Sequence, residues 1–342
     1  MQRLYTLDYL RGATAFFIMI YHYCSWMSIG NSPDSFLGKI GIYGVSIFYI
    51  LSGLTLYYVY QHNFTLSACC IKSFFLKRVF RIFPLLWLAS ILTILLSREL
   101  PTVETLILNL TGGFALFKPN DAIAVGAWSI GNELFFYLLF PLLIFTFKRP
   151  SIAISLNFIF LFVFGYFAYL MINPRVSLEN NWEIYVNPLN QVFLFFVGMA
   201  IGKFFVDKTF SQIKIVIVLS LVILLFFLWP VGIERTELIY GTNRLVLSFC
   251  SVIICICFFK LNNITVRPVH QAFLFLGEVS YSIYLVHPIV FRAFNYVIKS
   301  RFQMNKEMVI ICSMIITLII SFFVYEYFEK FFIRLSKNIK VK

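Results

Sequence analysis

The chain has 342 residues, of which 61% are hydrophobic and 13% are charged, whereas a soluble domain averages about 25% charged residues. This composition excludes a soluble globular protein and indicates an integral membrane protein. The formal net charge of +13 comes from basic residues that fall between apolar runs. That distribution is typical of membrane topology and argues against nucleic-acid binding.

Ten apolar segments are expected to cross a membrane, because a spanning helix needs about 20 apolar residues. The fold class is therefore all-α, a polytopic bundle in which residues 1–342 form a single membrane domain. Residues 67–82 are expected to lie on the membrane surface as an amphipathic helix, and residues 103–117 to form a re-entrant or interfacial piece. The ten segments are 5–27, 38–60, 83–98, 124–147, 151–172, 187–206, 213–231, 241–260, 271–297 and 307–331.

The placement of Lys and Arg predicts the orientation of these segments. With the N-terminus inside, the inner loops and tails hold seventeen basic residues and the outer loops hold ten. Because cytoplasmic segments carry the excess of basic residues, both termini are expected in the cytoplasm. The first apolar segment lacks a clear small-residue cleavage site, so it is expected to stay as the first span rather than leave as a signal peptide. The seven cysteines show no metal-ligand or disulfide spacing, so no metal is expected.

The first segment, LDYLRGATAFFIMIYHY, places Arg11 and His22 on one helix face. Eleven positions make about three turns, so the two side chains lie roughly 16 Å apart along the axis. Asp8 precedes Arg11 by three residues and is expected to pair with it. Ionisable groups inside a membrane are costly, and this favours a functional site. The alternative is that Asp8 and Arg11 are interfacial and extend to water.

The fourth segment carries Glu133, with Tyr137 one turn deeper on the same face. With the predicted topology, Glu133 lies near the depth of His22. A carboxylate opposite a histidine would orient it and stabilise its protonated form, as in a general-base pair. The alternative is a polar contact that only joins two helices.

Two further groups of polar residues lie near predicted helix ends. KRVFRIFP presents Arg78 and Arg81 at positions i and i+3, a pattern suited to phosphate binding or to lipid headgroups. GEVSYSIYLVHP places Ser280, Tyr284 and His287 on one face. These three residues would line a polar cavity, or His287 would satisfy backbone groups freed by the following proline.

Taken in order, these segments resemble the membrane acyltransferase-3 family, the O-acetyltransferases of bacterial surface polysaccharides. The Arg-x₁₀-His opening at Arg11 and His22 carries the resemblance, together with GIYGVSIFYILSG, the Arg-x-x-Arg element at Arg78 and Arg81, WSIGNELFFYLLFP and SYSIYLVHP. Many members carry an esterase-like domain beyond the membrane part. This sequence ends at Lys342 without one, so it resembles the stand-alone members.

The resemblance implies acetyl-CoA as cytoplasmic acyl donor and a glycan or lipid-linked sugar as acceptor, in a bacterial inner membrane. Arg78 and Arg81, with Arg11, would hold the donor phosphates. His22 would act as general base or accept the acyl group, Glu133 would orient or protonate His22, and Tyr137 would stabilise the oxyanion. Two alternatives stay open: a multi-pass transporter of an acyl group, lipid or sugar, and a structural subunit of an envelope-synthesis complex.

Overall fold

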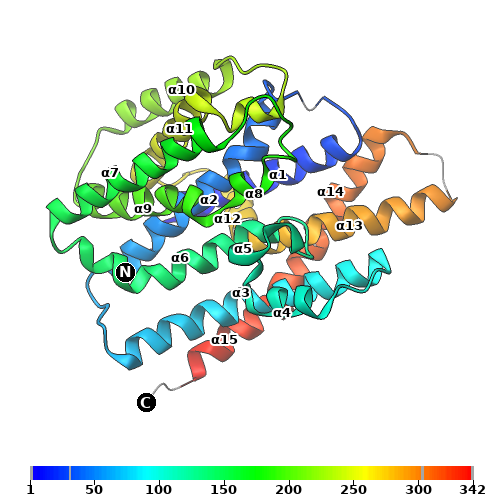
Figure 1. Ribbon diagram of the computed structural model, residues 1–342, viewed down its shortest axis with the longest axis horizontal. Coiled ribbons are helices and arrows are strands. Elements are labelled where there is room, and N and C mark those ends of the chain that lie inside the picture. Colours follow the sequence, from blue (N-terminus) through cyan, green and yellow to red (C-terminus); the bar gives the residue numbers. More distant parts are fainter. Residues whose placement is uncertain (1–2, 31, 302–303, 340–342) are drawn as a thin grey trace.

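The computed structural model describes residues 3–30, 32–301 and 304–339, and the side chains of residues 298–301 are outside that description. Lys340 and Lys342, which entered the charge count above, therefore lie outside the described residues, as do the side chains of Lys299 and Arg301. Within the described part, every regular element is helical. Both ends of the chain are marked at the left of Figure 1, and most long helices run from left to right.

Fifteen α-helices and four segments of 3-10 or π-helix make up the described fold. The α-helices are α1 (Tyr5–Trp26), α2 (Phe36–Tyr60), α3 (Ala68–Ser97), α4 (Val103–Thr111), α5 (Phe114–Phe117), α6 (Ala127–Thr146), α7 (Pro150–Tyr166), α8 (Trp182–Val186), α9 (Pro188–Phe205), α10 (Gln212–Leu228), α11 (Gly241–Lys260), α12 (Arg267–Glu278), α13 (Ser280–Arg301), α14 (Lys306–Phe323) and α15 (Lys330–Asn338). The others are η1 (Pro119–Asp121), η2 (Phe167–Met171), η3 (Arg235–Leu238) and η4 (Val324–Glu329).

Seven of the described helices, counted with the segments that continue them, are long and apolar enough to cross a membrane, or eight if the bent pair α12–α13 is one span. The expected count of ten is therefore not confirmed by length and composition. Of the other predicted spans, α10 has only 17 residues, and α1 is long enough but not apolar enough. The charged and polar side chains of α1 explain that shortfall.

The third predicted span is longer than expected. Residues 67–82 do not form a separate surface helix, because α3 runs without interruption through Pro84 for 30 residues. It begins at Ser67, whose hydroxyl accepts a hydrogen bond from the N–H of Cys70, and it ends at Arg98 in the left-handed conformation. The aromatic and basic first half of α3 is thus continuous with a candidate membrane span.

The segment expected to be re-entrant forms two short helices, α4 and α5. Gly112 separates them at a φ of 77°, a left-handed conformation that glycine adopts without steric cost. The carbonyl of Leu110 accepts a hydrogen bond from the Trp87 indole, which ties α4 to α3.

The core is built around α2 and α9, which pack against each other along their length. Small residues permit this close approach: a Cβ on Gly53 would lie 1.9 Å from the carbonyl oxygen of Phe195, and one on Gly198 would lie 2.1 Å from that of Ile50. Phe195 and Ile50 are themselves fully buried. Helices α1, α6, α7 and α11 pack against this pair, while α13 packs against α1, α3 and α14.

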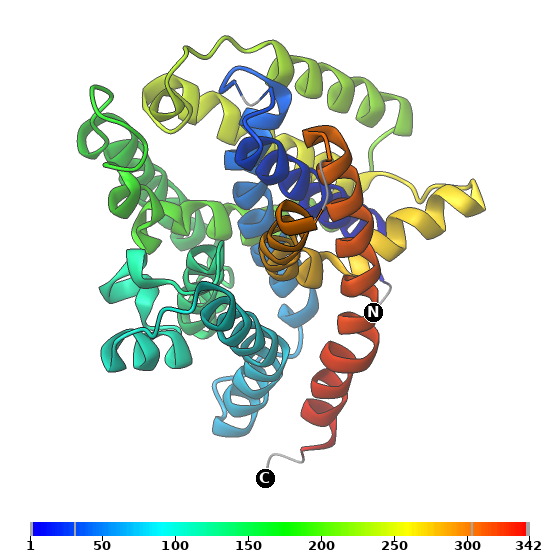
Figure 2. The same ribbon diagram turned by 90° about the vertical axis from the view of Figure 1, so that its right-hand side faces the viewer.

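A 68° bend divides α12 from α13 beside the start of α1. The backbones meet there, because a Cβ on Gly12 would lie 2.4 Å from the backbone nitrogen of Gly277, and one on Gly277 would lie 2.5 Å from the carbonyl of Asp8. In Figure 2, α13 is seen nearly end-on with α1, α3 and α14 around it, and it contacts all three. The bend therefore brings the polar start of α13 against the polar first turns of α1.

Candidate functional site

Three arginines converge on one hollow inside the bundle, which we call the arginine cavity. Its volume is about 120 Å³. Arg11 reaches it from α1, and Arg78 and Arg81 reach it from α3. The other lining residues are Val45, Phe48, Tyr49, Ser52, Thr55, Leu56, Ile82, Ser129, Ile130, Glu133, Tyr137, Ser280, Tyr281 and Tyr284.

The arginines of this cavity are only partly neutralised. Arg11 donates to Asp8 at 3.1 Å, as the i, i+3 spacing predicts, and Asp8 also binds Arg3 at 2.9 Å. No described carboxylate lies within ion-pair distance of Arg78 or Arg81, and the buried Nε of Arg78 has no hydrogen-bond partner. Three guanidinium groups facing one carboxylate make the cavity suited to an anion.

The one carboxylate of the arginine cavity is held in a small hydrogen-bond network. Glu133 accepts hydrogen bonds from Tyr137, one turn further along α6, and from the hydroxyl of Ser52 on α2 at 2.6 Å. The hydroxyls of Ser52 and Tyr137 are themselves 3.1 Å apart. The guanidinium of Arg78 lies 5.6 Å from the centre of the Tyr137 ring, so its charge faces this network.

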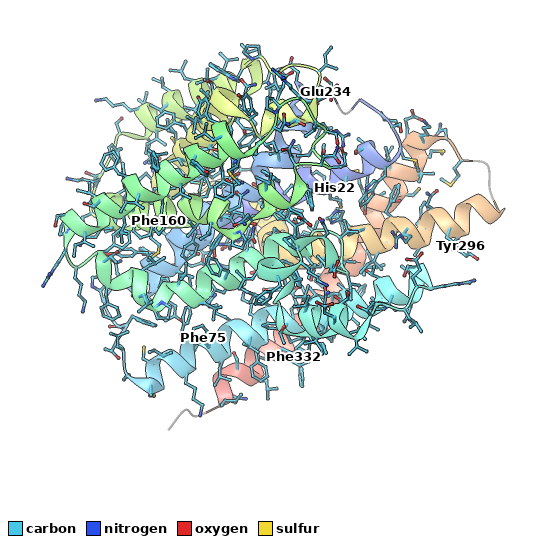
Figure 3. All side chains as sticks on the ribbon, viewed as in Figure 1. His22, Phe75, Phe160, Glu234, Tyr296 and Phe332 are labelled. Carbon is cyan, nitrogen blue, oxygen red and sulfur yellow. The ribbon has the colours of Figure 1, made fainter. Side chains whose placement is uncertain are left out.

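A second hollow of about 510 Å³, the histidine cavity, is lined by His22, by other residues of α1, α2, α6, α8 and α13, and by residues of the connecting segments. Three tryptophans, Trp26, Trp128 and Trp182, contribute flat apolar faces. Charged and polar groups come from Glu179, Arg235 and Asn120. Figure 3 labels His22 within the bundle and Phe75, on the α3 turn before Arg78, nearer the left of the view where the chain ends lie.

The loop charges of the histidine cavity are positioned by local bonds. Hydrogen bonds from its own backbone N–H and from the Ser177 hydroxyl, together with the positive charge of Arg235, lower the pKa of the Glu179 carboxyl. Arg235 donates to the hydroxyl of Ser25 on α1 at 3.2 Å. The cavity thus presents both signs of charge beside aromatic rings, an arrangement that can hydrogen-bond and stack a polyhydroxylated ligand.

His22 stacks on a second histidine. The ring centres of His22 and His287 are 5.3 Å apart, and Trp26 stacks on His22 at 5.2 Å. His287 is buried, and its Nδ1 donates to the carbonyl of Ile283 at 2.9 Å, while its Nε2 has no partner. This bond ties the His287 ring to the backbone of its own helix.

The two cavities share a wall at Tyr284. This side chain and Val45 line both hollows. The Tyr284 hydroxyl is 2.8 Å from the Ser129 hydroxyl and donates to the carbonyl of Gly126 at 3.2 Å. Gly126 has a φ of 82°, and a Cβ there would lie 3.1 Å from the Tyr284 hydroxyl. Tyr284 and Val45 therefore separate the arginine cavity from the histidine cavity.

Some predicted associations are confirmed and others are wrong. Ser280 and Tyr284 line the arginine cavity together, but His287 lies outside it. Among the described residues no hydrogen bond or ion pair joins Glu133 to His22, so the predicted pairing of the two is wrong. Each lines a different cavity, and Ser52 and Tyr137 both donate to Oε1 of Glu133.

Sequence reasoning missed three residues of the two cavities. Ser52 lies within GIYGVSIFYILSG and is absent from the predicted site residues, yet it bonds Glu133. Tyr281, which donates to the carbonyl of Ile82 at 2.7 Å, lies one position after a predicted residue. Arg235 lies in η3, a segment of four residues. So short a segment has no periodic pattern from which Arg235 could have been predicted as a site residue. Within the described part of the chain, no three His, Cys, Asp or Glu residues come together as a metal site.

Comparison with known proteins assigns the chain to a family. A family model described as an acyltransferase domain, acyltransferase-3, matches residues 4–326. No curated protein and no solved structure matches the chain. The matched range includes both cavities and every residue that lines them.

Proposed function

Because the chain belongs to the acyltransferase-3 family, we propose that this multi-pass membrane acyltransferase moves an acetyl group from cytoplasmic acetyl-CoA to a hydroxyl of a cell-surface or lipid-linked glycan. The proposal places the protein in a bacterial inner membrane. It keeps ten spans, with α1, α10 and the α12–α13 pair among them, and both termini in the cytoplasm. The arginine cavity then opens toward the cytoplasm and the histidine cavity toward the outside.

The observation that carries the proposal is the pair of cavities meeting at Tyr284. An anion-binding cavity lies on one side of this wall, and a larger cavity with a histidine, aromatic rings and loop charges lies on the other. Acyl transfer across a membrane needs a donor and an acceptor that approach a shared point from opposite faces. The two cavities supply those approaches.

On the donor side, the three arginines would bind the phosphates of acetyl-CoA. Arg78 and Arg81 have no described acid partner, so their charges are available to a ligand. Asp8 would hold Arg11 in place rather than touch the donor, since it already binds Arg3 and Arg11. A volume of about 120 Å³ suits a narrow thioester arm and leaves the nucleotide at the rim.

On the acceptor side, His22 would take the proton of the acceptor hydroxyl as its oxygen attacks the thioester carbonyl. A new C–O bond forms, the C–S bond breaks, and the electron pair leaves on sulfur as a thiolate. The Glu133–Tyr137–Ser52 network lies on the donor side, so we assign the Tyr137 hydroxyl the proton that neutralises this thiolate. Water then takes the proton from His22 and returns one to Tyr137, so the enzyme ends the cycle in its starting state. Tyr284, whose hydroxyl bonds the Ser129 hydroxyl and the Gly126 carbonyl at the wall between the cavities, would contact the reacting carbonyl.

The proposal is tested with the full chain in lipid nanodiscs, acetyl-CoA labelled in the acetyl group, and surface glycan from a strain lacking the gene. We expect label to enter the glycan as an alkali-labile ester, with one CoA released per ester. Release of CoA without ester, or movement of acetyl-CoA across sealed vesicles without product, would overturn the transferase assignment. The second result would favour a transporter.

A further inference from the structure

A small hollow inside the bundle, apart from the arginine cavity, has a buried arginine on its wall. It lies where α2, α9 and α11 contact one another (Figure 1), and its volume is about 10 Å³. Arg244 is the one charged residue among the described residues that line it, so we call it the Arg244 hollow. Each of these residues is buried: Ile42, Tyr43, Ser46, Phe164, Tyr185, Gln191, Ile239, Arg244 and Ser248.

The guanidinium of Arg244 has no opposite charge beside it. Arg244 is 2% exposed, and no described carboxylate lies within ion-pair distance of it. Its Nη2 donates to the Asn190 carbonyl at 3.3 Å, whereas its Nη1 has no hydrogen-bond partner. Its central carbon lies 4.2 Å from the centre of the Phe164 ring, which offsets part of the charge but accepts no edge-on N–H bond. Buried charges in proteins are paired as a rule, so an anion in the hollow would stabilise this one.

A second donor without a partner lines the same hollow. Ser248 lies one turn after Arg244 on α11, is 3% exposed, and its hydroxyl has no hydrogen-bond partner. The Gln191 amide uses one N–H for the Tyr185 carbonyl at 2.7 Å and has a second N–H to offer. Asn190, whose Oδ1 acceptor also has no partner, does not line the hollow. The unpartnered groups on this wall are therefore donors that an anion can accept from.

Two helix starts add to the positive potential of the guanidinium. Arg244 is the fourth residue of α11, which has 20 residues, and Gln191 is the fourth residue of α9, which has 18. The N-terminal end of a helix carries a partial positive charge, so both helices favour an anion near these first turns. A water molecule would satisfy the Ser248 hydroxyl but would leave the Arg244 charge unpaired.

The size of the hollow limits the occupant. About 10 Å³ is the space that a single bound water needs, and a chloride ion is close to water in size. Phosphate, sulfate and carboxylates are too large for it. The donors and the charge therefore suit one monatomic anion.

We propose that the Arg244 hollow binds one chloride ion, held by Nη1 of Arg244 and by the hydroxyl of Ser248. The inference does not depend on the proposed function. Ile42 and Tyr185 line both this hollow and the histidine cavity, so an ion entering from the histidine cavity passes only this wall. The bound ion neutralises a positive charge that otherwise lies directly behind that cavity.

The experiment uses the full chain in a nonionic detergent, exchanged into sodium gluconate, with radioactive chloride as probe. We expect saturable binding of one ion per chain and a higher Tm in chloride than in gluconate at equal ionic strength, because a ligand of the folded state stabilises it. Arg244→Met replaces the charge by an apolar side chain of similar length and is expected to abolish both effects. Arg175→Gln, at an exposed position that does not line the hollow, should keep both.

A second pair of variants tests the site if Arg244→Met does not fold. Ser248→Ala is expected to weaken chloride binding about tenfold, because one hydrogen bond to the ion is lost. Ser251→Ala is the matched control on the same helix: Ser251 is buried and donates to the Leu247 carbonyl at 2.9 Å, but it does not line the hollow. Its chloride affinity should equal that of the unchanged protein.

Crystals grown in sodium bromide distinguish an ion from water, because bromide scatters anomalously. An anomalous peak within hydrogen-bond distance of Arg244 Nη1 and Ser248 Oγ would support the inference, and density there without an anomalous signal would overturn it in favour of water. Equal Tm values in chloride and gluconate without saturable binding would also overturn it. So would chloride effects that persist at full size in Arg244→Met or Ser248→Ala.

Discussion

The hydroxyl of Tyr284 lies 2.8 Å from the hydroxyl of Ser129, and this hydrogen bond holds the side chain that closes the passage between the arginine cavity and the histidine cavity. The carbonyl of Gly126 accepts a second bond from the same hydroxyl. The wall is therefore the aromatic side chain of Tyr284, held at its tip, together with Val45.

Replacing Tyr284 by alanine should join the two cavities. Water from the histidine cavity would then reach the thioester, so we expect CoA release without acceptor to rise and ester yield per CoA to fall. Tyr284→Phe keeps the ring and loses the hydroxyl bonds, and should show a smaller effect. A thiol assay with and without glycan measures both quantities, and unchanged coupling in Tyr284→Ala would contradict the role of this wall.

Loss of His22 should abolish the chemistry without unfolding the protein. His22→Ala is expected to lower the rate of ester formation by about 10²–10⁴-fold, the usual contribution of a general base. His62→Ala, at an exposed position after α2, is the control and should keep full activity. Ester formation at the normal rate in His22→Ala, with equal protein in the membrane, would remove His22 from the mechanism.

The arginines of α3 should act mainly on donor binding. Arg78→Gln or Arg81→Gln is expected to raise KM for acetyl-CoA by about 10- to 100-fold, since hydrogen bonds to charged groups contribute about 1.5–3 kcal/mol. Lys77→Gln, an exposed neighbour on the same helix outside the cavity, should leave KM unchanged. Equal effects of all three substitutions would indicate a general surface charge instead of a site.

The contact between α1 and α12 should be intolerant of any side chain. Gly12→Ala would place a Cβ 2.4 Å from the Gly277 backbone, so we expect a loss of about 1–3 kcal/mol in stability and a lower Tm. Gly165→Ala on α7 meets nothing within 4 Å and should be neutral or stabilising. Thermal unfolding in detergent measures both, and equal Tm values would contradict the predicted clash.

Glu179 should not titrate in the working range of the enzyme. Its folded-state pKa is lowered below the ordinary 4.5, so its contribution to stability is present above that value and is lost only as the pH falls through the lower folded pKa. Between about pH 5.5 and 8 it stays ionised. Glu179→Gln should therefore change the level of activity and leave the shape of the pH profile unaltered, as initial rates across this range will show.

Local spacing predicted the parts of the site that lie on one helix. The Asp8–Arg11 pair and the Glu133–Tyr137 bond follow from i, i+3 and i, i+4 neighbours, which any α-helix brings together. The apolar segments likewise predicted an all-helical membrane fold, although the boundaries of α3 differ because Pro84 does not end that helix.

Contacts between helices were less predictable. The pairing of His22 with Glu133 was wrong because equal depth does not determine the rotation of each helix about its axis. That rotation depends on distant packing, such as the contact of Gly53 with Phe195, which directs Ser52 toward Glu133. Arg235 reaches the histidine cavity from the short segment η3, and the sequence has no periodic pattern there that would predict its position.

The wall at Tyr284 also affects how the transmembrane voltage would act on the reaction. Where water fills hollows entering from both faces, the transmembrane voltage falls mainly across the thin barrier between them, instead of over the whole bilayer. A unit charge moved through 100 mV gains or loses about 2.3 kcal/mol. With the proposed orientation, any charge that forms beside Tyr284 during turnover would be exposed to this focused field, and the reaction rate would depend on the membrane voltage.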